Sequence, residues 1–82
     1  MRAVISNRVA EQLAAAPDAV PRAFFKQLAH LLRDLRHPSL DAKKYPEAGP
    51  DIWQARITKN WRFYFKIDAD AYIITNADEH PK

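Results

Sequence analysis

The stretch that decides the fold is WQARITKNWRFYFKI, residues 53–67. It contains two runs rich in aromatic and β-branched residues with a short polar segment between them, which predicts two strands joined by a tight hairpin. Successive side chains of a strand point to opposite faces of a sheet, so each run separates into an apolar and a polar set. The apolar face is predicted to carry Trp53, Ala55, Ile57, Trp61, Phe63, Phe65 and Ile67, and the polar face Gln54, Arg56, Arg62, Tyr64 and Lys66.

The polar face carries two guanidinium groups, an ammonium group, an amide and a phenol, a combination that core packing does not require. Such a face suits a polyanion with stackable bases, so the residues favour RNA as a ligand. The aromatic residues of the opposite face alternate with the arginines, and we therefore expect them to pack in the core rather than to stack on bases.

Two helices are expected before the hairpin. Ser6 is predicted to cap a first helix that Pro17 closes, and residues 2–5 are either an edge strand or a lead-in. A second helix is expected to begin near Asp18 and to end at His37-Pro38, because proline disfavours helical geometry in the residue before it. Apolar residues recur there at helical spacing and predict a buried stripe: Phe24, Leu28, Leu31, Leu32 and Leu35.

Residues 38–50 hold three prolines and the only glycine, which indicates a connection rather than a regular element. Residues 71–75 are predicted to form a third hairpin-linked strand after a turn at residues 68–70. The expected fold class is therefore α+β, with two helices packed on one face of a small antiparallel sheet in the order β-α-α-β-β-β. The other face of the sheet, which carries Arg56 and Arg62, is expected to stay open. At 82 residues the chain is expected to be one domain spanning residues 1–82.

Composition limits the function classes. The chain is 48% hydrophobic and 28% charged, which is typical of a globular protein, and it has no cysteine for disulfides or thiolate metal sites. No apolar run approaches the length of about 20 residues that a membrane helix needs, so a soluble, cytoplasmic protein is expected. Eight basic residues and four acids between positions 33 and 66 give that segment a net charge of +4. This patch favours an anionic partner, with an ordinary solvated surface as the alternative.

Four segments together resemble the RelE/ParE toxin superfamily of type II toxin–antitoxin pairs: LRHPSL (35–40), Lys43-Lys44, IWQAR (52–56) and WRFYF (61–65). The resemblance covers nearly the whole chain and implies the family's strand–helix–helix–meander fold. It also implies one of two activities. The RelE-like branch cuts mRNA on translating ribosomes without a metal, whereas the ParE-like branch poisons DNA gyrase.

Metal-free RNA cleavage needs a base for the ribose 2′-OH, cations for the phosphate and an acid for the leaving oxygen. The resemblance implies phosphate contacts by Arg56 and Arg62 and an acid or base role for His80, which follows the last strand. It implies a general base at Glu47, with Asp51 as a competitor and an ordinary solvated loop acid as the favoured alternative. The aromatic residue that often follows this histidine in relatives is replaced by Pro81-Lys82. Residues expected to contact RNA, or simply to be solvated, are Lys43, Lys44, Gln54, Lys59, Tyr64 and Lys66.

The expected function is therefore that of a ribosome-dependent, metal-independent mRNA endonuclease toxin with no cofactor. Its expected partners are a cognate antitoxin, the ribosome and mRNA, with operator DNA reached only through the antitoxin and no membrane contact. The three histidines lack metal-ligand spacing. Two alternatives stay open: a ParE-like gyrase inhibitor, and an inactive member of the fold that binds RNA or its antitoxin.

Overall fold

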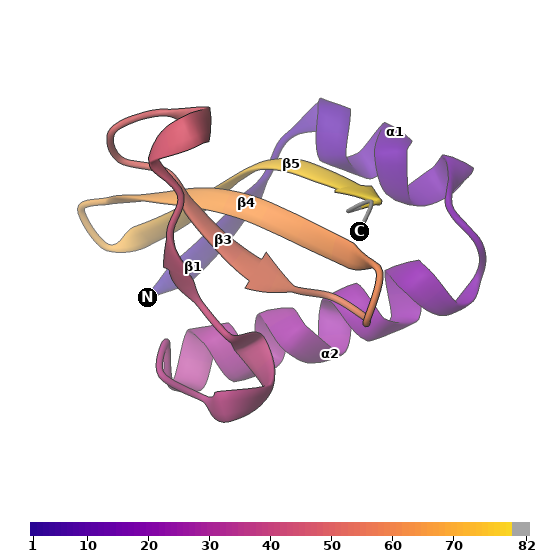
Figure 1. Cartoon of the computed structure of the whole chain (residues 1–82), viewed down its shortest axis with the longest axis horizontal. Coiled ribbons are helices and arrows are strands. Elements are labelled where there is room, and N and C mark those ends of the chain that lie inside the picture. Colours follow the sequence, from indigo (N-terminus) through magenta and orange to yellow (C-terminus); the bar gives the residue numbers. More distant parts are fainter. Residues whose placement is uncertain (80–82) are drawn as a thin grey trace.

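The computed structural model describes residues 1–79, so the predicted site residue His80 lies outside the described part of the chain. Two helices and a five-stranded sheet build the α+β fold that the sequence predicts (Figure 1). The elements in chain order are β1 (Arg2–Ile5), α1 (Asn7–Ala15), α2 (Ala19–Arg33), the 3₁₀ turn η1 (Pro38–Leu40), β2 (Lys43–Lys44), the 3₁₀ turn η2 (Pro46–Ala48), β3 (Trp53–Arg56), β4 (Trp61–Asp68) and β5 (Ala71–Glu79).

The sheet has the strand order β1-β5-β4-β3-β2. Strands β3, β4 and β5 form the predicted antiparallel meander, and Trp53 pairs with Phe65 as the alternation requires. Residues 2–5 are the edge strand rather than a lead-in. They pair with β5 in parallel, from Arg2 opposite Ala71 to Ile5 opposite Ile74, so the sheet is mixed rather than wholly antiparallel.

The connection over residues 38–50 is more regular than expected. Besides the turns η1 and η2 it contributes β2, in which Lys43 pairs with Gln54 and Lys44 with Trp53. The prediction of no regular element is wrong here, because β2 forms through partners about ten residues away. The prolines and lysines of residues 38–50 give no periodic signal.

Helix α2 ends at Arg33, before the expected stop at His37-Pro38. Asp34 leaves the helical region with an extended backbone at φ −162°. Its carboxylate accepts a hydrogen bond from the Arg36 backbone N–H at 2.9 Å, a local bond that competes with helix continuation. Ser6 caps α1 as predicted and accepts a bond from the Val9 N–H, whereas Asp18 makes no side-chain cap bond to α2.

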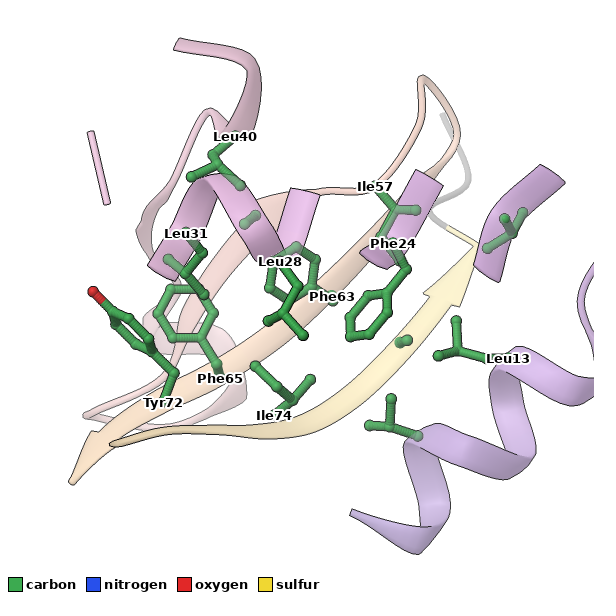
Figure 2. Close-up of a cluster of buried hydrophobic side chains, with 14 residues drawn as sticks. Leu13, Phe24, Leu28, Leu31, Leu40, Ile57, Phe63, Phe65, Tyr72 and Ile74 are labelled. Atoms are coloured by element: carbon green, nitrogen blue, oxygen red, sulfur yellow. The ribbon is translucent and has the colours of Figure 1, made fainter. Parts of the chain in front are cut away.

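The core lies between α2, α1 and the apolar face of the meander, as the helix stripe and the strand alternation predict (Figure 2). The Phe24 ring meets Phe63 edge-on with centroids 5.3 Å apart, and Phe65 meets Tyr72 in the same way at 5.4 Å. The prediction that Leu32 and Ile67 lie in the core is wrong, since they are 38% and 43% exposed. Ile67 lies beside the β4–β5 turn, where facing the apolar side does not ensure burial.

An irregularity in the β4–β5 ladder orients the last strand. The register shifts between Tyr64 and Phe65, and Thr75 donates its hydroxyl hydrogen to the Tyr64 carbonyl at 3.3 Å. A bulge of this kind changes which residues face a given side. Ile74 and Ala77 therefore both reach the core although they are three positions apart. Beyond the bulge, Asn76 lies opposite Tyr64 and Asp78 opposite Arg62, so both are on the polar face.

Gln12 fixes α1 beside this bulged end of β5. Strand β1 ends opposite Ile74, so β5 lacks a strand partner on that edge further along. The Gln12 side chain replaces it, because its Oε1 accepts the Ala77 N–H at 2.8 Å and its Nε2 donates to Asn76 Oδ1. The first turn of α1 thereby comes to the border of the polar sheet face.

Candidate functional site

The polar face of the sheet is partly covered by the segment from Tyr45 to Ile52, which we call the covering segment. It closes on itself through a hydrogen bond from the Tyr45 N–H to the Ile52 carbonyl at 2.8 Å. Gly49 allows this turn, since its φ of 150° suits glycine and a Cβ there would lie 3.1 Å from Ile52 Cγ1. Turn η2 of this segment and helix α2 lie on opposite sides of the sheet (Figure 1).

A cleft of about 410 Å³ lies between the covering segment and α1, above β4 and β5. We call it the open-face cleft. Its walls come from η2 and α1 and its floor from the sheet, so elements far apart in sequence build it. The lining residues are Arg8, Tyr45, Glu47, Ala48, Ile52, Tyr64, Thr75, Asn76 and Asp78.

Tyr64 and Gln54 lie on the predicted face, but they are buried rather than exposed, at 8% and 4%. The Tyr45 ring covers Tyr64, with centroids 5.5 Å apart, and Gln54 Nε2 donates a hydrogen bond to the Tyr64 hydroxyl oxygen at 3.2 Å. The expectation of a fully open face is therefore corrected. Burial raises the pKa of the Tyr64 phenol, against a smaller lowering by the Gln54 bond, so the hydroxyl stays protonated at neutral pH.

Arg62 is anchored to the β3–β4 hairpin. Its Nη1 donates to the backbone carbonyls of Thr58, Lys59 and Trp61 at 2.7, 3.2 and 3.1 Å. All three hydrogen bonds use the same nitrogen, Nη1. On the neighbouring strand β5, Arg62 lies opposite Asp78, which lines the cleft. The guanidinium thus fastens the hairpin at the border of the cleft.

Arg56, on β3, lies opposite Arg62. Its Nη2 is 3.7 Å from an Asp41 carboxylate oxygen, and its buried Nε has no hydrogen-bond partner within residues 1–79. Neither Arg56 nor Arg62 lines the open-face cleft. The structure places the two predicted phosphate ligands beside one another, with Asp41 and Asp78 as their neighbours.

The predicted RNA-contacting lysines are spread along the β2 edge and the hairpin instead of converging on the cleft. Lys43 and Lys44 form β2, and Lys44 Nζ lies 5.4 Å from the centre of the Trp53 ring. Lys44 and Lys66 line a separate hollow with Asp51. Of the two competing loop acids, Glu47 therefore lies at the open-face cleft and Asp51 does not. Lys59 is exposed in the hairpin turn.

No protein-family model matches the chain, and the comparison with curated proteins finds no match. Solved structures do match over almost the whole chain. A YoeB/ParE toxin from Agrobacterium tumefaciens is 13% identical at a TM-score of 0.79, covering 99% of this chain and 100% of that one. The chain has the fold of the RelE-like toxins.

Two toxin–antitoxin complexes support the same fold. The RelB-RelE complex from Methanococcus jannaschii matches at 14% identity and a TM-score of 0.75, covering 93% of this chain and 88% of that one. A YoeB-YefM complex from Staphylococcus aureus matches at 13% identity and 0.77, covering 96% and 95%. Identities this low establish the RelE-like fold and leave the activity to be argued from the site.

Of the residues that line the cleft in this RelE-like fold, the sequence predicts roles for Glu47 and Tyr64 and gives none for Arg8. The one signal for Arg8 is its position in the first turn of a capped helix, where the helix dipole disfavours a cation. Within residues 1–79 no three His, Cys, Asp or Glu side chains gather to hold a metal ion. None of the described helices has the length and apolar character that a bilayer crossing needs.

Proposed function

We propose that this chain is the toxin of a toxin–antitoxin pair and that it cleaves mRNA on the ribosome without a metal. The observation that carries the proposal is the open-face cleft of a RelE-like fold, whose lining includes a carboxylate, Glu47, and a neutral phenol, Tyr64. Arg62 lies at its border, opposite the lining residue Asp78. The fold's likeness to the toxins of the RelB-RelE and YoeB-YefM complexes supports a cognate antitoxin as partner.

The chemistry follows from these groups. Glu47 accepts the proton of a ribose 2′-OH, and the freed O2′ attacks the adjacent phosphorus. The bond from phosphorus to O5′ breaks, and His80 supplies the proton that O5′ takes. The products are a 2′,3′-cyclic phosphate and a 5′-hydroxyl end. A guanidinium is suited to the charge that builds up on the phosphate, which is the role we assign to Arg62, with Arg56 on a neighbouring phosphate.

In this proposal Tyr64 contacts RNA through its hydroxyl rather than by base stacking, because the Tyr45 ring covers the Tyr64 ring. The lysines at the β2 edge and the hairpin turn extend the contact with RNA beyond the cleft, as point charges on phosphates. The antitoxin covers this basic side, operator DNA is contacted through the antitoxin, and the protein acts in the cytoplasm. No cofactor takes part.

The test is induced expression without any antitoxin, followed by growth measurement and mapping of mRNA 5′ ends. Wild type should arrest growth and create new 5′ ends inside translated frames. Glu47→Gln and His80→Ala should lose both effects. Glu11→Gln is the matched control, since Glu11 is an exposed acid on α1 that does not line the cleft, and it should behave as wild type.

Two outcomes would overturn the nuclease proposal. Growth arrest with intact mRNA, together with inhibited DNA supercoiling, would identify a gyrase inhibitor of the ParE kind. Normal growth with soluble, folded protein would identify an inactive binding module. Cleavage that persists in Glu47→Gln would keep the nuclease and remove Glu47 as its base.

A further inference from the structure

The charges lining the open-face cleft are unbalanced. Two carboxylates, Glu47 and Asp78, face a cleft in which Arg8 is the one cationic lining residue from the described part of the chain. An RNA phosphate entering this space meets repulsion from both acids. A cation within the cleft is needed to offset that repulsion if RNA is to bind there.

The two arginines expected to hold phosphate are engaged elsewhere. Arg62 Nη1 is bonded to three hairpin carbonyls, and Arg56 lies beside Asp41. Turning either side chain into the cleft would break contacts that fasten the hairpin or the sheet edge. Arg8 needs no such rearrangement, because its exposed side chain already lines the cleft from α1.

The position of Arg8 on its helix is unfavourable for the fold alone. Ser6 caps α1, so Arg8 lies in the first turn, and no acidic residue in that turn offsets its charge. The positive end of the helix dipole repels a cation there. Within residues 1–79, Arg8 is in neither of the two ion pairs. The helix end thus disfavours the charge of Arg8 in the folded protein, whereas a bound anion would be attracted both by the guanidinium and by the helix end.

We propose that Arg8 is the phosphate-binding residue inside the open-face cleft, where it holds the RNA backbone opposite Glu47. Arg62 and Arg56 then act on phosphates from the border of the cleft, without turning into it. The inference rests on the proposed function and adds to it a ligand contact from α1. A guanidinium fork binds two phosphate oxygens at once, which fixes the orientation of the backbone as well as its charge. The phosphate then lies between a cation on the α1 wall and the base on the η2 wall.

The test measures binding of a fluorescent RNA oligomer with 2′-O-methyl riboses, which cannot be cleaved because the nucleophile is blocked. Anisotropy is followed over a range of salt concentrations for wild type, Arg8→Ala, Arg8→Lys and Arg22→Ala. Arg22 is the matched control, since it is an exposed arginine in the first turn of α2 and lines no part of the cleft.

Arg8→Ala should weaken binding about tenfold and reduce the slope of log affinity against log salt by about 0.7, the value for one lost contact to a single strand. Arg8→Lys should keep the slope with weaker binding, because the charge remains and the fork is lost. Arg22→Ala should match wild type. Thermal unfolding of Arg8→Ala should occur at the same or a higher temperature, which separates a ligand contact from a structural one.

The failure of this inference is distinguishable from the failure of the proposed function. If wild type binds RNA and cleaves mRNA, and Arg8→Ala binds RNA equally tightly, the phosphate-binding role of Arg8 is wrong and the nuclease proposal stands. Equal weakening in Arg8→Ala and Arg22→Ala would show an unspecific charge effect and would also remove Arg8. Wild type that neither binds RNA nor cleaves mRNA would overturn both proposals.

Discussion

Gln27 shows how a single buried amide can join three elements. Its Nε2 donates to the carbonyls of Ser39 and Arg56, both at 2.9 Å, and its Oε1 accepts the Ser39 hydroxyl at 3.2 Å. Gln27→Leu keeps a similar volume but leaves buried acceptors unpaired, which should lower the free energy of unfolding by about 2 to 4 kcal/mol. Urea denaturation checks this against Lys26→Ala, an exposed neighbour that should change little. An unchanged midpoint for Gln27→Leu would show that water replaces the amide.

The rings of His30 and His37 are stacked with centroids 3.8 Å apart, and we expect stability to depend on pH through His30. Burial of the ring, and then the charges of His37, Lys26 and Arg33, lower the pKa of His30 below its ordinary value of 6.5. Between that value and the lowered one the unfolded chain binds more protons, so stability should fall as the pH drops through this interval. Urea midpoints from pH 8 to 5 measure the slope. His30→Gln should flatten it, and an equal slope in that variant would contradict the assignment.

At the scale of elements, the β4–β5 hairpin holds an alanine in an unfavourable conformation. Ala69 is the first residue of the two-residue turn and has φ 54°, a left-handed value that favours glycine there. Ala69→Gly removes the Cβ clash at some cost in chain entropy, a net gain of about 0.5 to 1 kcal/mol. The unfolding temperature should rise by about 2 to 8 °C. Ala10→Gly, at an exposed interior position of α1, should lower it instead; a fall in both variants would contradict the turn argument.

The elements differ in how far sequence could predict them. Residues 53–67 and the stripe from Phe24 to Leu31 carry periodic signals, so the hairpin, α2 and the core face were predictable. The end of α2 was not, because the Asp34 carboxylate stops the helix before the proline does. Strand β2 was not predictable either, since pairing with β3 creates it.

At the scale of the molecule, the open-face cleft depends on packing that no local pattern encodes. Glu47 and Tyr64 could be proposed from sequence, but their meeting depends on the covering segment folding back through Tyr45 and Ile52. Arg8 reaches the cleft because Gln12 fastens α1 to β5. Alternation along β4 correctly predicts that Tyr64 faces the polar side. It carries no information on the position of Tyr45, which covers that face.

Because α1, α2 and the meander share a single core, the whole chain should unfold in one cooperative step. Trp53 and Trp61, which pack against this core, report on the sheet by fluorescence, while far-ultraviolet circular dichroism reports on the helices. The two urea transitions should coincide. Phe24→Leu shrinks the contact between α2 and β4 at the Phe63 ring, so it should shift both transitions equally, by about 1 to 2 kcal/mol. Separate midpoints, or a shift in the helix signal alone, would mean that α1 and its Arg8 can detach from a folded meander, and the cleft would then not be a fixed feature of the molecule.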